Sequence, residues 1–297
     1  MQRLSSRKEK LTSKEKTKIV AELRREYSIE LLLEISDLPR STYYYHLKNS
    51  EKGDKYKQIK ENIQKIFHEN RGRYGYRRIT ISLKRTGYLV NHKTVQKLMK
   101  ELGLACLVRV KKYKTYRGQV GNIAPNLLER DFNASKPNEK WVTDVTEFTL
   151  LGQKLYLSPI LDLYNSEIVS FSITERPVFG LIQSMLSKAF EKYADLEGLI
   201  LHTDQGWQYQ MKSYQNQLKD RGIRQSMSRK GNCLDNSVME NFFGLLKSEL
   251  LYLQEFTNIN HFKRELEDYI YWYNAKRIKG KLKGLSPLEY RTQSLVA

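Results

Sequence analysis

Apolar residues recur every three to four positions through the first hundred residues, a spacing that predicts helices with one buried face. The pattern covers 19–35, 43–47, 59–68, 77–86 and 92–102. Pro39 restricts the residue before it, and Ser41 and Thr42 offer N-cap side chains to the next helix. A helix, a tight turn and a second helix opening at Arg40 outline a helix-turn-helix, although an ordinary helical hairpin fits equally well. We expect the polar, basic residues 1–18 to be a frayed end.

The pattern changes near residue 140. Three β-rich runs, 141–150, 154–162 and 167–173, are separated by short polar turns that suit antiparallel hairpins. After them, predicted helices alternate with predicted strands: helix 178–194, strand 198–204, helix 210–221, strand 223–226 and helix 236–251. The order predicts an α/β domain with a mixed sheet, and a further helix is expected over 260–273.

Two stretches without clear periodicity divide the chain. Residues 49–57 are polar and contain Gly53, which is typical of a linker. In the second stretch, Val108 to Arg117 alternates basic with apolar or aromatic residues, which fits a linker lying along DNA or an exposed edge strand. We therefore predict a basic N-terminus with a helix-turn-helix-like segment over 1–48, a three-helix domain over 55–103, a basic linker over 104–138, a core over 139–255 and a helical tail over 256–297.

The charge balance indicates the kind of partner. Lys and Arg number 52 against 33 Asp and Glu, a net charge of +19 that predicts attraction to nucleic acid or an anionic membrane. No apolar run approaches the roughly 20 residues of a membrane span, and no signal peptide is visible. Cys106 and Cys233 are too few for a disulfide framework. We expect a cytoplasmic protein without a membrane partner that binds nucleic acid.

Three carboxylates stand out as candidate chemistry. Asp204 ends an apolar strand, where an ionised carboxylate is costly unless a cation or a donor compensates it. Asp144 lies inside another β-rich run, and Glu240 lies in a segment with helical spacing. On two strands and a helix, the three side chains can converge on the hard, oxygen-preferring ion Mg²⁺.

The short sequence motifs around these acids resemble those of a known protein family. They are Trp-x-Thr-Asp-x-Thr at Asp144, Asp-Gln-Gly at Asp204 and Asn-x-x-x-Glu-Asn-x-Phe at Glu240, with 35 residues (205 to 239) between the last two acids. Lys247 follows Glu240 by seven positions. From about residue 20 to residue 292, the chain resembles Asp-Asp-Glu (DDE) transposases of bacterial insertion sequences and, in its core, retroviral integrases. It looks like the second-frame product of two-reading-frame elements that move by copying out and pasting in.

The resemblance implies a ribonuclease-H-like core, with a five-stranded mixed sheet flanked by helices, behind small all-α helix-turn-helix segments. It implies DNA strand cleavage and strand transfer at the element's ends, with two Mg²⁺ ions about 3.5–4 Å apart, Mn²⁺ being a substitute. Asp144 would bridge both ions, with Asp204 on one and Glu240 on the other.

It also implies partners: DNA as terminal inverted repeats and target, further copies of the chain on DNA, and a first-frame protein or an N-terminal fusion. When bound to DNA, the protein would be associated with the nucleoid. We expect Asn236 and His202 to support the site. DNA contacts are expected from Lys247, Arg77, Arg78, Lys93, Lys97 and Arg40.

Alternatives remain at several positions. His202 suits a general base less well than a hydrogen-bonded structural histidine. We interpret Asp162 as a strand-end residue and Asp235 as an N-cap. Trp207 and Tyr209 suit either base stacking or core packing. For the whole chain, the rival functions are a nuclease of the same fold that does not join strands, and a non-catalytic helix-turn-helix DNA-binding regulator.

Overall fold

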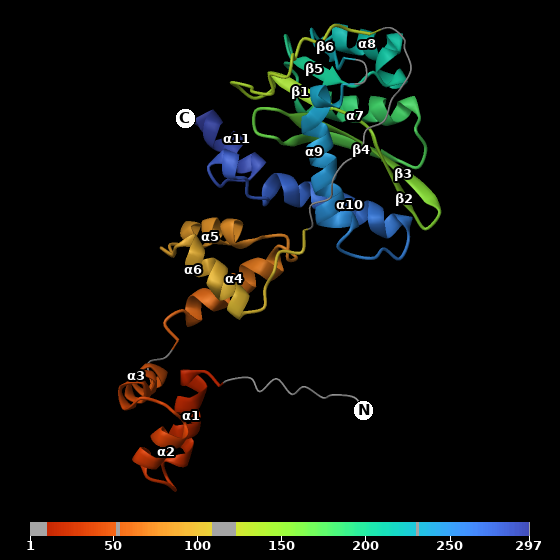
Figure 1. Cartoon of the computed structure of the whole chain (residues 1–297). Helices are drawn as coiled ribbons and strands as arrows, with labels where there is room; N and C mark the ends of the chain where they lie inside the picture. The colour runs from red at the N-terminus through yellow and green to blue at the C-terminus, as the bar shows by residue number, and fades with distance from the viewer. Residues whose placement is uncertain (1–10, 52–53, 109–122, 230–231, 297) are drawn as a thin grey trace.

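The computed structural model describes residues 11–51, 54–108, 123–229 and 232–296. Figure 1 shows a small helical bundle near the N-terminus, a second helical domain, and an α/β core with which the C-terminal helices are associated. No helix among the described residues is long and apolar enough to cross a membrane.

The first bundle consists of α1 (Ser13–Leu23), α2 (Ile29–Ile35) and α3 (Arg40–Glu51). Thr12 and Glu15 form a reciprocal capping box, so helix begins at Ser13, inside the stretch predicted to fray. Ser28 accepts a hydrogen bond from the Leu31 backbone N–H and caps α2, which is why the predicted helix 19–35 is two helices. The prediction for residues 1–10 falls outside the described residues.

The second helical domain consists of α4 (Lys57–Glu69), α5 (Tyr76–Arg85) and α6 (His92–Glu101), close to the three predicted helices. Each helix buries apolar side chains in one cluster, among them Ile63, Ile79, Leu83 and Val95. Most of the alternating segment predicted over 108–117 lies outside the described residues.

The core is a mixed sheet flanked by helices, which confirms the predicted fold class. Its strands are β1 (Lys140–Thr143), β2 (Thr146–Leu150), β3 (Gln153–Asp162), β4 (Ile168–Thr174), β5 (Ile200–Thr203) and β6 (Arg224–Met227). β3 pairs antiparallel with β1, β2 and β4, whereas β1, β5 and β6 are parallel.

The described sheet has six strands rather than five because the predicted strand 141–150 is interrupted at Asp144. On either side of the interruption the register with β3 is the same, with Thr143 opposite Ile160 and Thr146 opposite Leu157. Between them, the Val145 backbone N–H donates to Asp144 Oδ1 at 2.7 Å. A side chain that bonds its neighbour's backbone competes with the ladder, so β1 and β2 are two halves of one strand.

The two faces of the sheet bury different clusters. Trp141, Ile160 and Leu201 pack with α7 (Phe179–Lys192) and α8 (Lys212–Lys219). The alternate residues Val142 and Leu161 pack with α9 (Ser237–Leu246) and α10 (Ile259–Ala275), as the two-residue period of a strand requires.

The second cluster also contains the core of α4–α6, so the helical domain and the α/β core share one apolar interior. In Figure 1, α9 crosses the sheet and leads to α10, which lies between the sheet and α4–α6.

Short helices and a C-terminal helix complete the chain. They are η1 (Trp207–Gln210), η2 (Cys233–Asn236), the π-helical turn η3 (Lys247–Leu251), η4 (Gly280–Leu282) and α11 (Pro287–Val296). From α11, Arg291 pairs with the buried carboxylates of Asp162 and Glu167, both at the β3–β4 end of the sheet. Asp162 is thus a strand-end residue with a structural partner.

Candidate active site

Asp144 and Asp204 follow the C-terminal ends of two neighbouring parallel strands. The β1–β5 register pairs Lys140 with Ile200 and Val142 with His202. Asp144 and Asp204 both lie two residues beyond the Val142–His202 pair, each directly after the end of its strand, and paired strands are about 4.8 Å apart. Residues two apart share a face, so both aspartates belong to the face that α9 covers.

The surroundings of the pair disfavour its negative charge. Burial, then the charge of Asp204 and, more weakly, that of Glu240 raise the pKa of Asp144 well above its usual range. Burial also raises the pKa of Asp204. Among the described residues, no Lys, Arg or His forms an ion pair with either carboxylate. Two half-buried acids without a basic partner form the environment that a bound cation would compensate.

Hydrogen-bond donors hold both carboxylates in place. Asp144 accepts from the Asn236 side-chain amide at 3.1 Å as well as from Val145. Asp204 Oδ1 accepts from the Gly206 backbone N–H at 2.9 Å. A Cβ at Gly206 would lie 2.9 Å from the same oxygen and 2.7 Å from the Gln208 amide nitrogen, so a larger residue would force these side chains to shift. The glycine of the Asp-Gln-Gly motif therefore has a steric reason.

Glu240 stands apart from the pair. It lies in the first turn of α9, half-buried, and burial raises its pKa. Its charge reaches Asp144, but in the part of the chain that the structure describes no three His, Cys, Asp or Glu side chains lie close enough to hold a metal ion together. The structure brings together two of the three predicted acids and leaves the third on the adjoining helix.

His202 is buried beneath the site. One ring nitrogen lies 2.8 Å from Ser226 Oγ and the other 3.0 Å from Ser228 Oγ. Burial lowers its pKa to about 4, so the ring is neutral near pH 7. Both ring nitrogens are thus engaged by serine hydroxyls, which agrees with the interpretation of His202 as a hydrogen-bonded structural histidine. Sequence reasoning missed the two serines, whose only signal was their i, i+2 spacing around β6.

Asp235 is not the N-cap of α9, because that position belongs to Asn236 and carries no side-chain cap bond. The buried Asp235 carboxylate instead accepts hydrogen bonds from Arg229, Arg130 and Asn126. The Arg229 hydrogen bonds hold its pKa well below its usual range, in spite of burial. The cluster ties the start of α9 to the segment that precedes the core.

Three further candidates lie near the acids. The Lys247 ammonium lies 5.8 Å from the centroid of the Phe148 ring on β2, and burial lowers its pKa. Trp207 is 57% exposed, whereas Tyr209 is fully buried and belongs to the core. Of the two aromatic residues, only Trp207 is accessible to a ligand.

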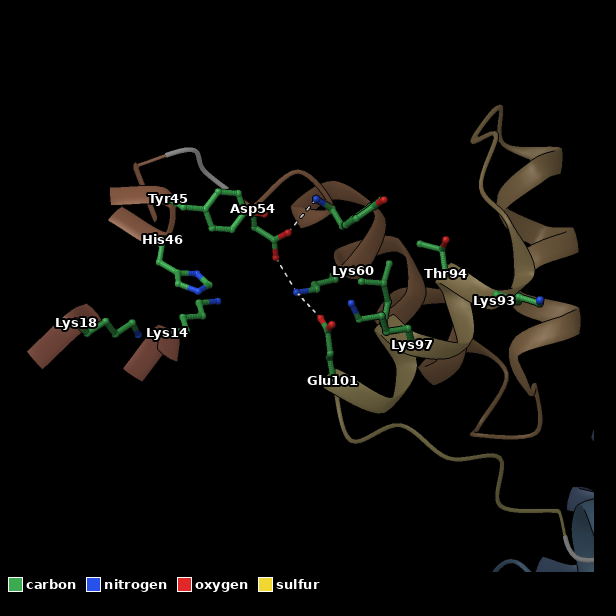
Figure 2. Close-up of a pocket in the computed structure, with 12 residues that line it drawn as sticks. Lys14, Lys18, Tyr45, His46, Asp54, Lys60, Lys93, Thr94, Lys97 and Glu101 are labelled. Carbon is green, nitrogen blue, oxygen red and sulfur yellow. Dashed lines mark hydrogen bonds and ion pairs between the residues drawn. The ribbon is translucent and has the colours of Figure 1, made fainter. Parts of the chain in front are cut away.

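The predicted DNA contacts fall into two groups. Arg40, Arg77, Lys93 and Lys97 are exposed. Lys93 and Lys97 line a cleft of about 870 Å³ between the two helical parts, together with Lys14 and Lys18 of α1 (Figure 2). Arg78 differs, because its guanidinium lies 3.7 Å from the buried carboxylate of Glu249. Because its guanidinium is held against Glu249, Arg78 is not one of the basic residues that face a polyanion.

Family comparisons agree with this architecture. Residues 134–233 match the integrase core domain, residues 240–295 match a second family of the same description, and residues 55–112 match an HTH-like domain. The fold and these matches define an enzyme of the DDE transposase and integrase class.

Two similar bacterial proteins show to which group of transposases the chain belongs. The putative transposase InsK for insertion sequence element IS150 of Escherichia coli is 57% identical over 277 residues, which cover 93% of this chain and 98% of that protein. An uncharacterized transposase-like protein of Haemophilus influenzae is 55% identical over 208 residues, covering 69% of this chain and 95% of that protein. The chain belongs to the insertion-sequence transposases.

A more distant likeness is to a solved structure of the HTLV-2 integrase catalytic core domain in complex with magnesium. It covers 53% of this chain and 98% of that chain, with 16% identity and a TM-score of 0.42. At this distance no property is carried over to the chain.

Proposed function

We propose that this transposase cleaves DNA at the ends of its own insertion sequence and joins the freed ends to target DNA, using Asp144, Asp204 and Glu240. The observation that carries the proposal is that Asp144 and Asp204 directly follow two paired parallel strands, half-buried and without a basic partner. Glu240, on α9 over the same face, is close enough for its charge to act on Asp144 and is the third acid of the proposed set.

The residues present fit a divalent cation, because buried carboxylates are the ligands of hard ions. We propose Mg²⁺, with Mn²⁺ as a substitute and two ions in the complete site. When bound, the cations supply positive charge that stabilises the attacking and leaving oxygens of a phosphodiester.

The surrounding residues preorganise the acids. The Asn236 amide and the Val145 N–H fix the orientation of Asp144, and the Gly206 N–H fixes that of Asp204. Because these donors are in place before DNA arrives, little reorganisation is required during the reaction. We assign Lys247, the first residue of η3 behind α9, to a contact with a phosphate of the DNA end.

DNA is positioned by the helical parts of the molecule. We assign Arg40, Arg77, Lys93 and Lys97 to phosphate contacts, which supply affinity but little sequence information. The substrates are terminal inverted repeats and target DNA. We propose that several copies of the chain assemble on them in the cytoplasm, on the nucleoid, and that a first-frame protein assists end recognition.

A joining assay with labelled oligonucleotides tests the proposal. In Mg²⁺, the chain should convert a pre-cleaved element end with a free 3′-hydroxyl into strand-transfer products. Asp144→Asn, Asp204→Asn and Glu240→Gln should each lower joining by at least about a hundredfold and leave the DNA affinity within about twofold, because catalysis rather than binding loses a ligand.

The rival functions give different results. Hydrolysis products without joined strands would indicate the nuclease. Normal joining by any one of the three variants would contradict the assignment, and the absence of any metal-dependent reaction alongside tight DNA binding would favour the regulator.

A further inference from the structure

A buried carboxylate lies on the helical segment that carries Glu240. Glu249 lies in the π-helical turn η3, which continues α9 without a break, and it is 1% exposed. It accepts hydrogen bonds from Arg277 at 2.6 and 2.9 Å and from the Tyr269 hydroxyl at 2.9 Å. Burial opposes its charge, but these bonds and the nearby guanidinium charges outweigh it and lower its pKa. Glu249 is therefore ionised.

The HTH-like domain holds the same residue with two arginines. Arg78 of α5 lies 3.7 Å from the Glu249 carboxylate. Arg73, in the turn before α5, donates from Nε to the Glu249 backbone oxygen at 2.9 Å. The Arg73 guanidinium is also packed over the Trp272 ring of α10, 4.6 Å from its centroid. Both of these arginines of the HTH-like domain therefore contact Glu249, Arg78 at its carboxylate and Arg73 at its backbone oxygen. These contacts lie inside a packed interface.

Both ends of the α9–η3 segment are anchored. At its start, Asp235 is bound by Arg130 and Arg229, and Asn236 is bonded to Asp144. At its other end, Glu249 follows Glu240 by nine residues, about 13 Å along a helix axis. A π turn contains one more residue than an α turn, and such turns are frequent at functional sites. The Arg78–Glu249 contact therefore links α5 directly to the segment that carries Glu240.

We propose that Arg78 is a positioning residue: through Glu249 it couples the placement of the HTH-like domain to the position of Glu240. The inference rests on the proposed function and deepens it. DNA held by the helical domain would thereby influence how closely Glu240 approaches Asp144 and Asp204. Arg78 acts on catalysis through Glu249 and not as a phosphate contact.

Joining by the full chain at saturating pre-cleaved DNA separates these roles. Arg78→Ala should lower the maximal joining rate about tenfold and leave the DNA affinity within about twofold, and Arg78→Lys should recover most of the rate. Arg85→Ala is the matched control. Arg85 lies on the same helix and pairs across the interface with Glu289 of α11, away from α9, so the variant should keep the wild-type rate.

Mn²⁺ binding, followed by electron paramagnetic resonance, gives a readout besides activity. Arg78→Ala should weaken Mn²⁺ binding severalfold in the same direction as Glu240→Gln, and Arg85→Ala should not. Wild-type joining and Mn²⁺ affinity in folded Arg78→Ala, or a loss of DNA affinity that explains its slower joining, would overturn the coupling. If the wild-type chain itself does not join strands, the proposed function fails, and the Mn²⁺ comparison still decides the coupling.

Discussion

His202 shows how the charge state of one buried residue bears on the site. Its imidazole lies between two serine hydroxyls and is fully buried, two residues before Asp204. The folded protein favours the neutral ring, since protonation would place a charge in an apolar interior. Protonation of His202 at acid pH should therefore destabilise the folded state in which β5 presents Asp204.

The stability of the chain should fall in acid because of this residue. The pKa of His202 is lowered from 6.5 to about 4, so between these values the unfolded state binds more protons and stability is lost as the pH falls. The loss amounts to about 3 kcal/mol between pH 7 and pH 4, at about 1.4 kcal/mol per pKa unit.

Urea unfolding of wild type and His202→Gln across this range isolates the contribution, because other groups titrate in both proteins. The difference in unfolding free energy between the two should shrink by about 3 kcal/mol from pH 7 to pH 4. A difference that stays constant with pH would contradict this.

At the scale of single residues, the sequence alone was enough to select Asp144, Asp204 and Glu240 as the candidate acids. They lie in short motifs whose residue types and order are distinctive. The sequence could not predict the partners of Asp235. Arg130 lies far from Asp235 along the chain, and no local pattern links them. It also could not show that Glu240 stands apart from the aspartates, because that depends on the placement of a whole helix.

Among the elements, α11 is joined to the sheet by one buried cluster. Arg291 is 7% exposed and pairs with Asp162 and Glu167, while Lys192 of α7 also reaches Glu167. One arginine thus compensates two buried acids that belong to β3 and to the turn before β4.

Replacing Arg291 with Ala should lower the free energy of unfolding by about 3–5 kcal/mol, since it removes the guanidinium that two buried carboxylates share. Thr292→Ala is the control, because Thr292 is exposed on the same helix. Urea denaturation measures both variants. A loss for Arg291→Ala no larger than that of the control would show that the cluster does not stabilise α11.

Apolar periodicity predicted nearly every element, but with boundaries that local hydrogen bonds alter. Ser28 divides one predicted helix and the Asp144 carboxylate interrupts one predicted strand. Apolar periodicity predicted a single helix over 236–251 and gave no signal for the π turn that follows α9.

At the scale of the whole molecule, several lysines line the cleft between the two helical parts. Lys93 and Lys97 are exposed on α6 and, among the described residues, neither forms an ion pair, whereas Lys60 in the same cleft is neutralised by Asp54 and Glu101 (Figure 2). The sequence predicted the basic character, but not which cations are already paired.

Each of these two lysines should contribute to the salt dependence of DNA binding. Lys93→Ala and Lys97→Ala should each reduce the slope of log K against log salt concentration by about 1, the value for one released counterion. Fluorescence anisotropy at several salt concentrations measures the slope. Lys154→Ala, on the β2–β3 hairpin, is the control, and equal slopes in all four proteins would exclude the contact.

The ladder between β1 and β5 has a practical consequence. Main-chain hydrogen bonds across the paired strands β1 and β5 set the separation of Asp144 and Asp204, so an exposed turn in the connection between them can be lengthened without changing it. The β2–β3 turn at Leu151 and Gly152 lies in that connection and is exposed at Leu151. A fluorescent reporter or an affinity peptide inserted there would lengthen the polypeptide while leaving the two aspartates in register.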